Sequence, residues 1–87
     1  MRLVPTALGP GSVLVRFHPD DGSRYDRMIV VTPEEDGRVL HLMGWIGAPL
    51  TPAEWQAARD ALFPKAREVQ FERLTGVELV EHRLLLR

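Results

Sequence analysis

The chain contains no cysteine, and this absence excludes several classes of protein at once. Without a thiol there can be no disulfide framework, no Cys-ligated metal and no thiol nucleophile. Acidic and basic residues nearly balance, with a formal net charge of −1, so no overall field draws the chain toward nucleic acid or anionic lipid. No apolar run approaches the about 18 residues of a membrane span, and the N-terminus lacks the apolar core of a signal peptide. We therefore expect a cytoplasmic protein with no membrane contact.

Lysine is also scarce, because ten arginines accompany the single Lys65. Together with frequent Ala, Gly, Pro and Leu, this bias is typical of a GC-rich genome. It favours a bacterial or phage origin over a binding role for the arginines.

Recognisable catalytic and metal-binding motifs are missing as well. The three histidines, His18, His41 and His82, fall in different predicted strands and have no metal-ligand spacing. His18 and the two aspartates of residues 20–23 form the best local cluster for a hard cation or acid–base chemistry, but residues 20–23 have the composition of a β-turn. No serine lies in an elbow motif, and no phosphate-binding glycine loop precedes a helix. We predict no catalytic residue, no metal and no cofactor.

Residues 51–54, Thr-Pro-Ala-Glu, specify the start of a helix. The Thr51 hydroxyl can accept from the backbone N–H of Glu54, and the Glu54 carboxylate can accept from the N–H of Thr51, which is a capping box. Pro52 follows at the first helical position, where its missing N–H costs nothing. Pro64 disfavours helical geometry in the residue before it. The sequence therefore predicts one helix over residues 52–63.

This helix has a single apolar face. At 100° per residue, Trp55, Ala58 and Leu62 fall together, and polar side chains point away from them. Leu50 and Trp55 occupy the two positions of a hydrophobic staple. The helix should therefore pack on one face of a sheet through this side.

Alternating apolar residues and turn signals predict strands on both sides of the helix. We assign them to residues 12–18, 25–32 and 38–45 before the helix, and to residues 67–74 and 77–86 after it. Residues 5–11 read as a loop after a short strand at residues 2–4. The prediction for residues 1–87 is a single α+β domain, a mostly antiparallel sheet of about five strands with one helix, in the order β-β-β-α-β-β.

The strands carry more apolar side chains than one three-turn helix can cover. Residues 28–31 and 39–43 are apolar on both sides, which is typical of strands covered on both faces. Three arrangements would account for this excess. The sheet could curl into a half barrel, the N-terminal segment could fold across it, or a second protein could cover it.

We expect the third arrangement, self-association or binding of a protein partner through a sheet face. A contiguous apolar surface of more than a few hundred Å² is uncommon on a soluble monomer. Tryptophan contributes disproportionately at interfaces. The candidate interface residues are Trp45, Trp55, Met28, Val30, Leu40, Leu42, Leu84 and Leu86.

The resulting prediction is a non-catalytic interaction or structural assembly protein. Two other classes stay open, a nucleic-acid-binding accessory protein and a small enzyme subunit. A nucleic-acid-binding protein would need a basic and aromatic sheet surface, which the predicted strands could assemble from Arg67, Val69, Phe71, Arg73, Arg83 and Arg87. The carboxylates interleaved with these arginines favour cross-strand ion pairs instead, so nucleic acid is the less favoured partner.

Overall fold

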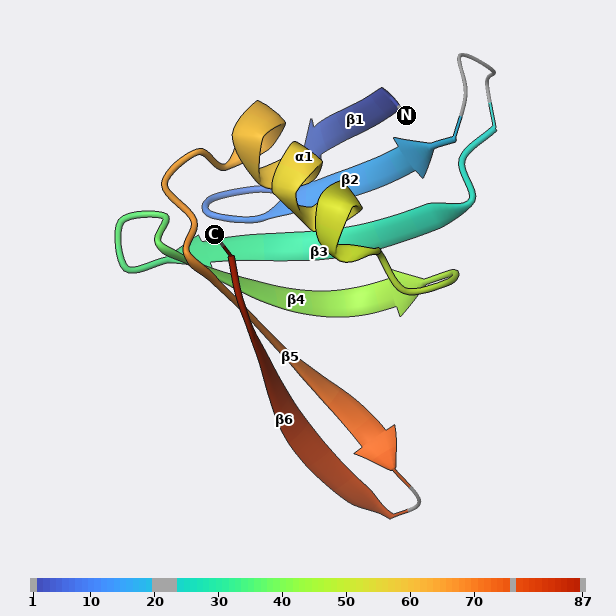
Figure 1. The fold of residues 1–87 in the computed structure, drawn as a ribbon, viewed down its shortest axis with the longest axis vertical. Coiled ribbons are helices and arrows are strands. Elements are labelled where there is room, and N and C mark those ends of the chain that lie inside the picture. Colours follow the sequence, from blue (N-terminus) through green and yellow to red (C-terminus); the bar gives the residue numbers. More distant parts are fainter. Residues whose placement is uncertain (1, 20–23, 76, 87) are drawn as a thin grey trace.

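The computed structural model describes residues 2–19, 24–75 and 77–86. This part of the chain forms six strands and one helix, which are β1 (Arg2–Ala7), β2 (Val13–His18), β3 (Arg27–Glu34), β4 (Val39–Ile46), α1 (Pro52–Leu62), β5 (Glu68–Thr75) and β6 (Glu78–Leu85). The strands are hydrogen-bonded in the order β1-β2-β3-β4-β5-β6, and the β4–β5 pair is parallel while the others are antiparallel (Figure 1). The predicted α+β class is confirmed, with six strands in place of about five.

Strand β1 corrects the prediction of a loop over residues 5–11. It runs to Ala7 and pairs antiparallel with β2, with Pro5 opposite Val15. Proline lacks the N–H that an interior strand needs, but an edge strand tolerates it, and β1 is an edge strand. The N-terminal segment therefore extends the sheet and does not fold across it.

The helix begins as predicted and ends one residue earlier. The N–H of Glu54 donates to the Thr51 hydroxyl at 3.2 Å, and the N–H of Thr51 donates to the Glu54 carboxylate at 2.9 Å. Phe63 is the C-cap, and its N–H donates to the Arg59 carbonyl. Leu50 and Trp55 are both buried, as a hydrophobic staple requires.

The core lies between α1 and one face of the sheet. Trp55 and Ala58 are the buried helical residues, as their spacing predicts, and Leu62 packs at the margin of the core. The buried strand residues on this face are Val15, Phe17, Ile29, Val31, Leu40, Leu42 and Val69. Figure 1 shows α1 over the β2–β3 side of the sheet, and the β5–β6 hairpin extends away from it.

The parallel β4–β5 contact is short and leaves part of the hairpin unsupported. It joins only residues 39–42 of β4 to residues 68–71 of β5. Beyond Phe71, β5 pairs with β6 alone. We call this outer part of the hairpin, residues 72–75 and 77–81, the hairpin arm.

The crossing from β4 to α1 depends on Gly47. Its φ of +101° is a conformation that L side chains rarely adopt. A Cβ at this position would overlap the Asp26 carbonyl oxygen and lie 2.7 Å from Cγ of Arg27. The backbone of this loop is therefore in close contact with the start of β3.

We predict that Gly47→Ala destabilises the fold more than Gly11→Ala does. Both glycines have positive φ, but a Cβ at Gly11 has no atom within 4 Å, so G11A isolates the cost of backbone strain. That strain is on the order of 1–2 kcal/mol, and G47A adds a steric overlap of about 1–3 kcal/mol. Urea unfolding of both variants measures the difference, and equal losses would contradict the close contact at Gly47.

Candidate interaction surfaces

An ion pair between buried Arg27 and half-buried Glu54 attaches the helix to the sheet. The Arg27 guanidinium donates to both carboxylate oxygens of Glu54, at 2.8 and 2.6 Å, and its Nε donates to Asp26 at 3.2 Å. Arg27 is only 7% exposed, and its guanidinium lies 5.7 Å from the centre of the Phe17 ring. The bond from Arg27, followed by that from the Thr51 N–H, lowers the pKa of Glu54 from 4.5 to about 2. The carboxylate of Glu54 in turn raises the pKa of Arg27.

This pair is structural. Each charge is satisfied by the other, and neither faces an open site. The capping box predicts the role of Glu54 at the helix start but not its partner Arg27. Arg27 begins β3, far from α1 in sequence, so only the packing of α1 on the sheet brings the two together.

The opposite face of the sheet carries a second set of apolar side chains. Cross-strand pairing aligns Leu14, Val30 and Met43 in one row, and it aligns Met28 with Ile46 in the next. Met43 and Ile46 are each 57% exposed, and the other three are half-buried. Among the described residues, the only helix packs on the other face. We call these five residues the open face.

The hairpin arm and the edge strand β6 carry further exposed apolar side chains. Leu79 and Leu85 lie on the open-face side of β6 and are 68% and 76% exposed. Val77 and Val80 are exposed as well. A two-stranded ribbon is marginally stable by itself, and these side chains make no compensating core. The arm therefore has the composition of a segment that packs against another surface.

An aromatic cleft of about 590 Å³ lies between the end of β4, the start of α1 and the hairpin. Trp45 makes edge-on contact with Trp55 at 5.8 Å between ring centres and lies 6.2 Å from Phe71, which stacks on His82 at 5.2 Å. The indole N–H of Trp45 donates to the carbonyl of Ala48. The aromatic rings therefore pack against one another, which is typical of side chains at the rim of a core.

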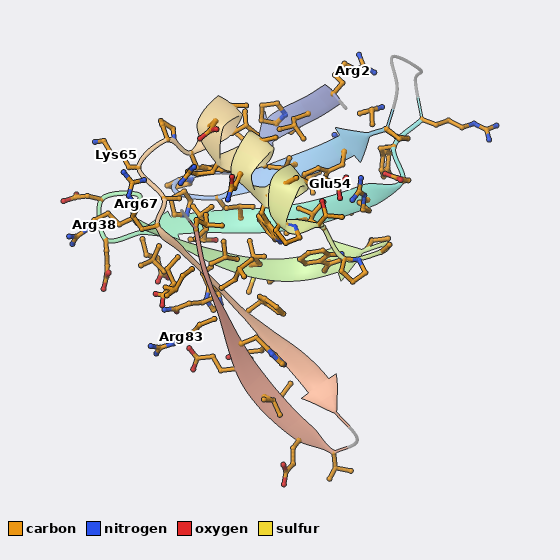
Figure 2. The ribbon with its side chains drawn as sticks, viewed as in Figure 1. Arg2, Arg38, Glu54, Lys65, Arg67 and Arg83 are labelled. Carbon is orange, nitrogen blue, oxygen red and sulfur yellow. The ribbon has the colours of Figure 1, made fainter. Side chains whose placement is uncertain are left out.

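The predicted basic and aromatic surface is not assembled. Arg83 is opposite Gln70, whereas Phe71 is opposite His82, so Arg83 and Phe71 lie on different faces. Arg83 also forms an exposed ion pair with Glu81 at 3.5 Å. Figure 2 shows Arg67 with Arg38 and Lys65 at the end of the sheet where the hairpin begins, whereas Arg83 lies further along β6. Arg87 and the side chain of Arg73 lie outside the described residues.

The predicted interface residues divide between the two faces. Met28 and Val30 lie on the open face, half-buried. The other six lie on the helix face, where Leu40, Leu42, Trp55 and Leu86 are buried and Trp45 and Leu84 pack against the core. The structure adds Leu14, Met43 and Ile46 to the open face. The alternation within residues 12–18 separates Leu14 from Val15 and Phe17. Met43 and Ile46 could not be assigned, because a bulge shifts the β3–β4 register between Met28 and Val30.

No family model, curated protein sequence or solved structure matches this chain. Within the described ranges, no group of three His, Cys, Asp or Glu side chains could hold a metal ion. No helix in those ranges is long and apolar enough to cross a membrane. The two aspartates of the predicted His18 cluster lie in residues 20–23, outside the described part.

We predict a pH-dependent loss of stability that Glu54→Gln removes. The depressed pKa means that Glu54 stabilises the fold fully above about pH 4.5 and that this contribution is lost as pH falls toward about 2. At pH 7, E54Q should lower the free energy of unfolding by about 1.5–3 kcal/mol, the usual contribution of a hydrogen bond to a charged group. The difference from the parent chain should shrink below pH 4.5.

Asp60→Asn is the matched control, because the Asp60 side chain is 71% exposed and pairs with its neighbour Arg59 at 2.9 Å. An exposed pair of this kind contributes little, so D60N should change stability little at any pH. Urea unfolding from pH 2.5 to 7 compares the variants. A constant gap between E54Q and the parent chain across this range would contradict the role given to Glu54.

Proposed function

We propose that the chain is a non-catalytic interaction or assembly protein that binds a protein partner through the open face of its sheet. The observation that carries this proposal is the exposure of Met43 and Ile46, next to half-buried Leu14, Met28 and Val30. Helix α1 packs on the other face, so these side chains have no covering element among the described residues.

The chemistry of this face supports a protein partner. It has an apolar centre, and polar side chains border it, with Arg16 opposite Met28 and with Thr32 opposite His41. An apolar centre with a polar rim is the usual anatomy of a protein–protein interface. Methionine also adapts its shape to a partner surface, because its side chain is unbranched and flexible.

The described residues favour binding over catalysis. The bidentate ion pair of Arg27 with Glu54 joins the helix to the sheet, so these two side chains already bind each other. The aromatic cleft is bordered by Glu72, His82 and Arg83, of which Arg83 pairs with Glu81 and His82 stacks on Phe71. A nucleophile, a base and an orienting group in hydrogen-bond contact do not occur among them, as a catalytic site of that kind requires.

We predict that the double substitution Met43→Ser and Ile46→Ser leaves the fold intact and reduces binding of a hydrophobic dye. The two side chains are more than half exposed, so their removal costs little packing. Val77→Ser is the control, since Val77 is 97% exposed but lies at the tip of the arm. Dye fluorescence and urea unfolding are the measurements. Equal dye signals for the double variant and V77S would show that the open face is not the dominant apolar surface.

Photo-crosslinking tests the proposed partner directly. A photoreactive amino acid replaces Ile46 on the open face in one variant and Ala57, an exposed position on α1, in the other. In extracts of the source cells, the first variant should give an adduct of discrete mass with another protein, and the second should not. Adducts of equal yield from both positions, or none from position 46, would overturn the proposal.

A further inference from the structure

Strand β6 is an unprotected edge of the sheet. It is eight residues long, it contains no proline, and its register with β5 is continuous from Leu85 to Glu78. The other edge strand, β1, carries Pro5. A long, regular edge presents unpaired backbone N–H and C=O groups that can pair with another strand.

We infer that the occupant is β6 of a second copy of the chain. Two copies pair edge to edge and antiparallel about a two-fold axis perpendicular to the sheet, so the two six-stranded sheets join into one. This dimer uses a different surface from the open face and does not depend on the proposed function. Its register is selected by the charges and apolar residues of β6.

Symmetry restricts the possible registers. In an antiparallel pair, residues directly opposite each other point to the same face. A two-fold axis perpendicular to the sheet then requires that one residue of β6 lies opposite its own copy, and the neighbours on each side pair reciprocally. Each choice of the central residue gives one register, and the registers differ in which charges meet.

The register centred on His82 matches charge with opposite charge and apolar with apolar. Glu81 lies opposite the partner's Arg83, and this pair occurs twice. Leu79 lies opposite the partner's Leu85, also twice, which covers two side chains that are 68% and 76% exposed in the single chain. On the helix side, Val80 lies opposite the partner's Leu84.

The neighbouring registers fail on charge. A register centred on Glu81 places this carboxylate opposite its own copy and places Leu79 opposite the partner's Arg83. A register centred on Arg83 places two guanidinium groups together and pairs Glu81 with the partner's Leu85. Like charges directly opposite one another are destabilising, so both are disfavoured.

The single chain also carries a charge conflict that this dimer relieves. Glu81 lies directly opposite Glu72 of β5, which is a like-charge pair. In the single chain, Glu81 has its contact with Arg83, at 3.5 Å between exposed side chains. In the dimer, the partner's Arg83 lies on the other side of Glu81 from Glu72. Each Glu81 then faces Glu72 on β5 and the partner's Arg83 on the adjoining β6 strand.

The geometry has a consequence for the open face. Because the axis is perpendicular to the sheet, the open faces of both copies lie on the same side of the joined sheet. A partner with two matching sites would then bind with higher avidity than one with a single site.

Charge reversal tests the register. Glu81→Arg alone and Arg83→Glu alone each create like-charge pairs, and we expect each to weaken dimerisation about tenfold or more, since every pair occurs twice. The double variant E81R/R83E restores opposite charges and should restore the dimer. Sedimentation equilibrium measures the mass against the 9.9 kDa of one chain, and circular dichroism confirms folding. A parent chain that stays monomeric at high micromolar concentration would overturn the dimer. A folded double variant that dimerises no more strongly than the single variants would overturn the register.

Disulfide trapping is an independent test, because the chain has no cysteine of its own. His82→Cys places two thiols opposite each other across the axis, so this variant should form a covalent dimer on mild oxidation. Glu81→Cys alone should not, whereas a mixture of E81C and R83C should form the mixed dimer. Efficient self-linking of E81C in place of H82C would overturn the register.

Photo-crosslinking through position 46 should be unaffected by E81R, so failure of the dimer and failure of the proposed function are separable.

Discussion

The ion pair between Arg27 and Glu54 holds the fold together at the point where helix meets sheet. Glu54 serves two purposes, since its carboxylate closes the capping box with Thr51 and accepts both guanidinium bonds of Arg27. The start of α1 is therefore attached to the start of β3. Gly47 lies against the Asp26 carbonyl and the Cα and Cγ atoms of Arg27, where a Cβ would overlap them. Removing Glu54 would leave the buried Arg27 guanidinium with Asp26 as its remaining carboxylate partner, and the loss of two charged hydrogen bonds is costly.

The position of α1 also decides which surfaces are left for function. A helix of three turns, held over β2 and β3, buries the central part of one face of the sheet, and in the described part of the chain no helix packs on the other face. The short parallel contact between β4 and β5 adds to this asymmetry, because it lets the hairpin arm extend beyond the core. The open face follows from the position of the helix and the β6 edge from the strand order, and both carry apolar side chains that a single copy exposes.

Local signals predicted most elements but not the whole sheet. The capping box, the helix face and the alternation of β2 depend on neighbouring residues, so they can be predicted from the sequence. Strand β1 was not, because Pro5 reads as a loop residue and only its place at the sheet edge makes it acceptable. The candidate site was less predictable still. Leu40 and Leu42 are buried, whereas Met43 in the same apolar run is exposed, and composition does not separate them.

The sequence by itself determined where the helix starts, which side of it is apolar and that the strands have more apolar residues than the helix can cover. These properties follow from hydrogen bonds and periodicities within a few residues. Tertiary structure decided which of those residues remain at the surface. A bulge between Met28 and Val30 shifts the pairing of β3 with β4. Strand β5 pairs with only the first half of β4. Burial depends on such long-range pairing, because a side chain is shielded only by what packs over it.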